Sequence, residues 1–107
     1  MLEDLLMDEL FSGESQFALD HRGHAVAVVV ENSGPISTTV RLFVGGRLVD
    51  TKHALSTTVR LPTDLPGPEG PHRIEVKVSL SLLGDVKACT LREGPAQLEM
   101  PRLDRRS

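Results

Sequence analysis

Residues 37–52 read STTVRLFVGGRLVDTK, and the first six letters recur at residues 56–61. Threonine, valine and leucine alternate here with polar residues. This is typical of a strand with one buried face, because successive side chains of a strand point to opposite faces. Gly45 and Gly46 supply the positive φ angles that a tight hairpin requires. The stretch predicts a hairpin of residues 37–44 with 47–52, followed by a strand at residues 56–61.

The two copies of the hexapeptide are separated by one strand that reverses the direction of the chain. We therefore expect the copies to run parallel to each other, either on the two sides of that strand or in facing sheets. Threonine tolerates both water and strand packing. Both copies are consequently candidates for exposed sheet edges.

Five further runs are predicted to be strands, because apolar residues alternate or cluster between turn residues. The run 72–80 alternates most regularly, with Ile74, Val76 and Val78 on one face and charged residues on the other. The run 24–31 carries alanine and valine on both faces, as expected of a central strand covered on both sides. The other runs are residues 16–20 (an edge strand), 86–91 and 97–100, and a proline-rich loop is expected at 62–71.

Short strands at roughly ten-residue spacing predict an all-β fold, an antiparallel β-sandwich of seven to eight strands. The chain has 107 residues, which is enough for one domain. We assign residues 14–100 to the sandwich, 1–13 to an N-terminal helix and 101–107 to a flexible tail. Aromatic residues make up only 3%. The core is therefore expected to be aliphatic, and stacking platforms for sugars or bases are not expected.

Charge and cysteine content narrow the class of partner. The formal net charge is −3, which disfavours nucleic-acid binding, because that function needs a positive surface. A single cysteine cannot form an internal disulfide and fits a reducing compartment, so we expect a cytoplasmic protein. No apolar stretch is long enough to span a membrane. Arginine outnumbers lysine, which indicates a GC-rich genome and a bacterial source.

Three stretches carry a family resemblance: VVVENSGP at 28–35, VRLFVGGRLV at 40–49 and GPHRIEV at 70–76. They are similar to the valine-rich strand, Asn-containing turn, glycine hairpin and penultimate strand of immunoglobulin-like adhesion modules of the CARDB and fibronectin III type. The resemblance covers about half of the chain. It implies an immunoglobulin-like fold whose function is to bind or space other domains.

The N-terminal segment (residues 2–11) is predicted to be a short amphipathic helix. Its acids lie on one side, and Ser12-Gly13 ends it. Such a helix can lie in a partner's groove with residues i, i+3 and i+4 as anchors, or it can pack on the chain's own sandwich. Under the first interpretation the partner-binding residues are Leu2, Leu5, Leu6, Leu10 and Phe11.

Metal and catalytic chemistry has candidates, but each has a simpler explanation. Zinc binds imidazole and thiolate ligands. His21 and His24 form a His-x-x-His pair, and the sequence also contains His53, His72 and Cys89. The pair, however, lies at a predicted turn, and no carboxylate completes a known spacing. A nucleophilic cysteine would need a histidine base and a lowered pKa. We therefore expect Cys89 to be a small hydrophobic residue in or near the core. We expect no metal site, no catalytic residue and no cofactor.

Other motifs do not change this expectation. The sequence has no Gly-x-Ser-x-Gly elbow, and no phosphate loop follows Gly45-Gly46. The basic tail with Arg102, Arg105 and Arg106 falls short of a lipid-binding cluster. We expect a non-enzymatic protein–protein interaction or assembly module, a small accessory subunit that binds a protein partner or self-associates into a homo-oligomer. The N-terminal helix, a strand edge or the proline-rich loop would form the contact. The alternative is a small metal-binding protein or enzyme that uses its His and Cys residues.

Overall fold

The structure is a computed structural model, and it describes residues 14–34, 37–82 and 84–103. These residues form nine strands and no helix. The strands are β1 (Glu14–His21), β2 (His24–Gly34), β3 (Ser37–Val44), β4 (Arg47–His53), β5 (Thr58–Leu65), β6 (His72–Leu80), β7 (Val86–Glu93), β8 (Ala96–Glu99) and β9 (Arg102–Leu103). The predicted N-terminal helix lies outside the described residues.

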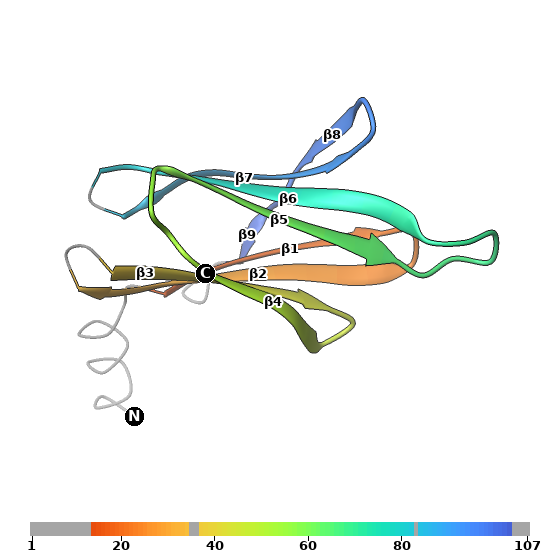
Figure 1. The fold of residues 1–107 in the computed structure, drawn as a ribbon, viewed down its shortest axis with the longest axis horizontal. Coiled ribbons are helices and arrows are strands. Elements are labelled where there is room, and N and C mark those ends of the chain that lie inside the picture. The colour runs from red at the N-terminus through yellow and green to blue at the C-terminus, as the bar shows by residue number, and fades with distance from the viewer. Residues whose placement is uncertain (1–13, 35–36, 83, 104–107) are drawn as a thin grey trace.

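The strands form two antiparallel sheets that pack face to face as a β-sandwich (Figure 1). Sheet A has the order β4-β3-β2-β1-β9, and sheet B has the order β5-β6-β7-β8. Within each sheet, strands that follow each other in the sequence therefore pair with each other, and β9 returns from the end of the described chain to pair with β1. The described part contains no helix long and apolar enough to cross a membrane.

One aliphatic core fills the space between the sheets. From sheet A, Val26 and Val28 of β2 and Leu42 of β3 are fully buried, and from sheet B so are Val76 and Leu91. Burying each such side chain contributes about 1.5–3 kcal/mol. Phe17 is the one buried aromatic residue among the described residues, which confirms the expected aliphatic core. The alternation predicted for residues 72–80 is also confirmed, since every second residue of β6 from Ile74 to Leu80 is buried.

The two hairpin turns of sheet A each have two successive positive φ angles, as predicted for Gly45-Gly46. Gly45 and Gly46 have φ angles of 61° and 81°, values at which a residue without a Cβ avoids a steric clash. The β1–β2 turn has the same sign at both positions, with φ angles of 52° at Arg22 and 79° at Gly23. Two successive positive φ angles match the right-handed twist of the flanking strands.

The positions of three predicted strands differ from expectation. The first hexapeptide lies in β3, an interior strand of sheet A, and only the second lies at an edge, in β5. The two copies are in facing sheets, as one of the two alternatives predicted. β1 is not a plain edge strand, because β9 pairs with it at Gln16 and Phe17. β2 is central, but among the described residues only one of its faces is covered, since Ala25 is exposed and Val29 is half-buried.

Three local features were also predicted wrongly. Pro62 belongs to β5 and not to the proline-rich loop, because an edge strand tolerates a residue that donates no hydrogen bond. The strand predicted at residues 86–91 does not alternate regularly, because a bulge at Lys87 shifts the register so that Val86 pairs with Leu80. Arg102 and Leu103, assigned to the flexible tail, form β9 and raise the number of strands to nine.

Specific contacts join the two sheets around the core. The chain crosses from sheet B to sheet A at residues 100–101: the N–H of Met100 donates to the carbonyl of Cys89 in β7 at 2.9 Å, and the carbonyl of Pro101 accepts from the N–H of Ala18 in β1 at 3.1 Å. On the opposite side of the sandwich, Lys52 Nζ of β4 donates to the carbonyl of Arg60 in β5 at 2.7 Å. At one end, Asn32 Nδ2 donates to the carbonyl of Gly84 at 3.0 Å. These contacts fix how the two layers sit on each other.

Candidate functional site

The predicted partner-binding residues lie outside the residues that the structure describes. They are Leu2, Leu5, Leu6, Leu10 and Phe11. The candidate site is therefore built from the surface of the sandwich itself.

Sheet A presents a continuous row of apolar side chains on its outer face, away from sheet B. The register pairs Ala18 of β1 with Ala27 of β2, Ala27 with Phe43 of β3, and Phe43 with Leu48 of β4. Because side chains alternate along each strand, this row lies on the face opposite the core residues. Four adjacent strands therefore contribute one apolar side chain each to the same line across the sheet.

Further apolar residues border this row and widen it. Val29, half-buried, lies two residues from Ala27 on the same face of β2. Leu103 of β9, which pairs with Gln16 of β1, is 47% exposed. We call the set Ala18, Ala27, Val29, Phe43, Leu48 and Leu103 the apolar face of sheet A. A contiguous apolar patch on a folded surface is typical of a contact site.

Polar groups frame the apolar face and pair with each other. Arg41 Nη1 donates to Glu31 Oε1 across β3 and β2, and the two side chains are one-third to two-fifths exposed. Thr39 Oγ1 and His53 Nδ1 lie 3.1 Å apart, in a hydrogen bond between β3 and β4. These pairs occupy the end of the face near the β2–β3 turn and leave the apolar row free of charge.

The outer face of sheet B has the opposite character. One row across its four strands consists of Arg60, Lys77, Thr90 and Glu99. Ion pairs connect neighbouring strands, with Arg60 Nη1 3.2 Å from Glu75 Oε1. This charged surface is well solvated, so covering it would carry a desolvation cost that the apolar face of sheet A does not have.

The free strand edges carry features that hinder the addition of another strand. β5 contains Pro62, and Lys52 of β4 lies over the carbonyl of Arg60 at the β5 edge. β7 has a bulge at Lys87, and the outermost strands β8 and β9 have four and two residues. Prolines, edge lysines, bulges and short edge strands are the devices by which proteins avoid edge pairing. Within the described residues the edges are consequently weaker candidates than the apolar face.

Glu93 of β7 gathers side chains that are far apart in the sequence. Its Oε1 accepts a hydrogen bond from His21 Nε2 at 2.7 Å, and its Oε2 accepts one from Arg22 Nη2 at 2.7 Å. His72 Nδ1 lies 3.8 Å from Oε2. The hydrogen bonds from Arg22 and then His21 lower the pKa of Glu93 to about 2, and the Arg22 bond also raises the pKa of that guanidinium. The cluster ties β1 of sheet A to β7 of sheet B.

The predicted metal candidates do not converge on one point. His24 Nε2 donates to the carbonyl of Pro66 at 2.7 Å, and His53 lies on the outer face of sheet A beside Thr39. His21 and His72 do meet at Glu93, but Arg22 occupies the same carboxylate. The part of the chain that the structure describes contains no group of three or more His, Cys, Asp or Glu residues that could hold a metal ion.

Cys89 is a core residue, as the simpler interpretation predicted. It is 2% exposed, and its Sγ lies 3.7 Å from Met100 Sδ. Burial raises the pKa of the Cys89 thiol to about 12, whereas a nucleophilic thiol needs a lowered pKa. The arrangement therefore stabilises the core and does not activate the sulfur.

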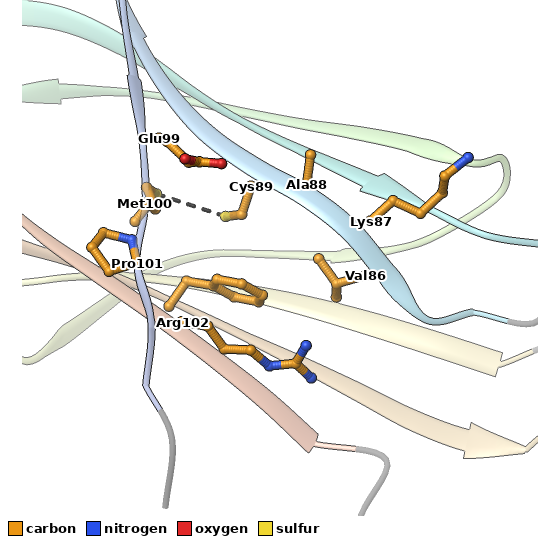
Figure 2. A pocket seen from close by; sticks show the side chains of 9 residues that line it. Val86, Lys87, Ala88, Cys89, Glu99, Met100, Pro101 and Arg102 are labelled. Atoms are coloured by element: carbon orange, nitrogen blue, oxygen red, sulfur yellow. Dashed lines mark hydrogen bonds between the residues drawn. The ribbon is translucent and has the colours of Figure 1, made fainter. Parts of the chain in front are cut away.

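Figure 2 shows a cavity beside Cys89, between β7 and the β8–β9 crossing. It has a volume of about 390 Å³, with Phe17, Val86 and Met100 among its apolar lining residues. Arg102, from the predicted tail, stacks on Phe17 with its guanidinium carbon 5.6 Å from the ring centroid. It also donates to Ser15 Oγ at 2.8 Å. Arg102 is thus part of the fold and is engaged in it.

Two of these features were missed in the sequence. The Arg22–Glu93 pair joins residues 71 positions apart, and no local pattern announces such a contact. The apolar face did leave a signal, because Ala25, Ala27 and Val29 alternate with the buried valines of β2. That signal was interpreted as a strand covered on both sides.

Comparison of the chain with known proteins does not assign it to a family. No protein-family model matches the chain, and neither does any curated protein or any solved structure.

Proposed function

We propose that this chain is a non-enzymatic interaction module, a small cytoplasmic accessory or assembly subunit that binds a protein partner. Its contact surface is the apolar face of sheet A together with the N-terminal segment. The observation that supports this proposal is the difference between the two outer faces of the sandwich, one apolar along a row of four strands and the other charged.

The energetics of burial favour the apolar face as the contact surface. Removing apolar area from water stabilises a complex by about 25 cal/mol per Å². Phe43 and Leu48 lie side by side on this face, and Leu48 is still 49% exposed. An aromatic side chain beside aliphatic ones is the kind of anchor that dominates protein interfaces. A partner that covers Phe43 and Leu48 gains this energy without stripping water from a charge.

The proposal includes an immunoglobulin-like sandwich in the broad sense of two antiparallel layers around one core. The layers and the glycine hairpin support this class. The connections are simpler than in immunoglobulin constant domains, whose two sheets interleave strands from different parts of the sequence. Here each sheet is a run of consecutive strands, with β9 added to sheet A.

The other predicted contact surfaces have less support. The strand edges carry bulges, lysines or a proline, as described above. The proline-rich loop is shorter than expected and is engaged internally, since His24 binds Pro66 and the N–H of Gly70 donates to the carbonyl of Gly67 at 3.1 Å. The alternative of an enzyme or metal protein is weakened because its His and Cys candidates are paired within the fold or buried.

The test compares one charged substitution on each outer face. Phe43→Lys places a charge in the apolar row, and Thr90→Lys places the same charge in the charged row of sheet B. Tagged full-length proteins would capture partners from the native host, quantified by mass spectrometry, with light scattering to detect self-association. We expect Phe43→Lys to lose a partner that the wild type and Thr90→Lys retain. Identical capture by all three proteins, with circular dichroism showing each to be folded, would reject the proposal.

A further inference from the structure

Side-chain size changes in order along the apolar row of sheet A. Ala18 of β1 and Ala27 of β2 are small, whereas Phe43 of β3 and Leu48 of β4 are large. One half of the row is therefore low and the other half is high. We propose that this face binds the same face of a second copy of the chain, so that the high half of each copy packs on the low half of the other. The inference rests on the proposed function for the identity of the contact face, and it names the partner.

The symmetry of such a pair follows from the order of the row. Identical subunits that use the same patch are related by a two-fold axis, and sheets that pack face to face keep their strand directions within about 30°. An axis that runs along the strands, midway between β2 and β3, places Phe43 opposite Ala27 of the second copy and Leu48 opposite its Ala18. An axis that runs across the strands would instead stack Phe43 on Phe43 and leave alanine facing alanine. Only the first arrangement fills the interface, and close packing is what protein interfaces share with protein interiors.

The two most exposed residues of the apolar face meet in this arrangement. Leu48 is 49% exposed and Leu103 is 47% exposed in the single chain. Leu103 pairs with Gln16, two residues before Ala18 on the same face of β1, so it stands beside Ala18. Leu48 of the second copy, placed over Ala18, therefore contacts Leu103 as well. Two exposed leucines cover each other at each end of the interface, and the removal of apolar area from water favours association.

The charged pair beside the row is compatible with the same axis. Arg41 of β3 lies next to Val29 of β2 in the neighbouring row, so it meets Val29 of the second copy. Glu31 follows Val29 by two residues on the same face, about 7 Å along the strand. The guanidinium of Arg41 already donates to Glu31 of its own chain, and the dimer brings the carboxylate of Glu31 of the second copy near it. Charges of opposite sign therefore lie close to each other across the interface, which is electrostatic complementarity.

The area of the face is sufficient for a weak dimer. Sheet A has four long strands, and β1 and β3 have eight residues each. Spacings of about 4.8 Å between strands and about 3.3 Å between residues give a face of about 19 Å by 26 Å. Two copies then bury about 1,000 Å², which is the lower limit for a specific interface. We therefore expect a dimer that exchanges with the monomer in solution.

The first test measures the oligomeric state of the full chain. Sedimentation velocity is recorded from low micromolar to millimolar concentration for the wild type, for Phe43→Lys and for the control Thr90→Lys on sheet B. We expect the wild type to dimerise as its concentration rises, and Thr90→Lys to dimerise within about twofold of the wild type. Phe43→Lys should weaken dimerisation by more than about tenfold, because a central anchor is replaced by a charge that loses its water. Circular dichroism shows whether each variant is folded.

The second test asks whether positions 43 and 27 face each other. Phe43→Lys and Ala27→Glu should each be monomeric alone. When mixed, they set two introduced charges of opposite sign against each other at one contact and keep Phe43 opposite Ala27 at the other. We expect the mixture to recover a dimer with one chain of each kind, identified by its mass in native mass spectrometry. Leu48→Lys with Ala27→Glu is the matched mixture, in which the charges are not opposite each other, and it should recover about fivefold less mixed dimer.

Three results would overturn the inference. The first is a wild type that stays monomeric over the whole concentration range. The second is a mixture of Phe43→Lys and Ala27→Glu that dimerises no better than either variant alone. The third is equal recovery in the mixture with Leu48→Lys, because the faces would then associate in a different arrangement.

The inference and the proposed function fail separately. If the wild type stays monomeric while Phe43→Lys still loses a partner in the capture experiment, the face binds a different protein. The inference is then rejected, and the proposed function stands. If the wild type dimerises, Phe43→Lys is monomeric and both capture the same other proteins, the inference stands and the binding of a different protein at this face is rejected.

Discussion

The outer faces of the two sheets differ although the inner faces are built alike. Both sheets direct valine and leucine side chains into one common core. Outside, sheet B presents Arg60, Lys77 and Glu99, whereas sheet A presents Ala27, Phe43 and their neighbours. The residues on the inner faces show how the two sheets pack, and the residues on the outer faces show whether a sheet is exposed to water. By this measure the outer face of sheet B is well solvated, whereas the outer face of sheet A leaves apolar side chains such as Leu48 exposed to water.

The largest effect is expected when inner residues of either sheet are shortened. Leu42→Ala in sheet A and Leu91→Ala in sheet B each open a cavity among fully buried side chains. Each should lower the free energy of unfolding by about 2–5 kcal/mol. The next residue along each strand tests the outer faces. Arg92→Ala should change the free energy of unfolding by less than about 0.5 kcal/mol, whereas Phe43→Ala should lower it by more, because Phe43 is half-buried beside Ala27 and Leu48.

Urea unfolding followed by circular dichroism measures all four variants under the same conditions. An equal effect of Phe43→Ala and Arg92→Ala would remove the distinction between the two outer faces. A small effect of Leu42→Ala or Leu91→Ala would instead contradict the common core.

A second prediction separates inner from outer positions by chemical reactivity. Burial raises the pKa of Cys89 from its ordinary value of 9.0 to about 12, so the thiolate fraction at neutral pH falls about a thousandfold. Iodoacetamide should therefore modify the folded protein very slowly and the urea-unfolded protein rapidly. A Thr90→Cys variant carries a second thiol on the outer face of sheet B and should gain one modification quickly. Fast labelling of Cys89 in the folded wild type would show that this part of the core opens.

A third prediction concerns the contact between the sheets at Glu93. The pKa of Glu93 is lowered from 4.5 to about 2 in the folded state, so its ion pairs stabilise the protein above pH 4.5. This stabilisation is lost as the pH falls towards 2, because the unfolded state binds a proton first. Glu93→Gln should lower the melting temperature at pH 7, and the difference from wild type should vanish near pH 2. A difference that persists at pH 2 would mean that the glutamine disturbs packing and not charge.

The smallest effect is expected on the charged face of sheet B. Arg73 Nη1 lies 3.3 Å from Asp64 Oδ1, and the two side chains are 68% and 51% exposed. Exposed ion pairs contribute about 0–1 kcal/mol and are screened by salt. Arg73→Ala should therefore leave the melting temperature nearly unchanged, with less effect still in 1 M salt. A marked destabilisation would show that this face also contributes an organised network and is less open to solvent than its exposure indicates.

The sequence predicted most strands, and it predicted the buried face of β6, the strand that alternates most regularly. Residues 72–80 and 37–44 were placed correctly because alternation and turn residues act locally. The bulge at Lys87 was missed because a register shift depends on the neighbouring strand. β9 was missed because a strand of two residues is too short to show an alternation of apolar and polar residues. The surface of the candidate site was misinterpreted for a related reason, since a sequence shows that a face is apolar but not what covers it.

The order of the strands has a consequence for how the protein is made. All four long strands of sheet A lie within residues 14–53, so this sheet is synthesised before β5 begins. Contacts between adjacent hairpins form early, because short loops close at little entropic cost. Until sheet B emerges from the ribosome, the inner valines of sheet A are exposed to other nascent chains. At that stage β4 is a free edge of sheet A, and it carries a register shift against β3 and the lysine Lys52, which are features that hinder pairing of an edge with another chain.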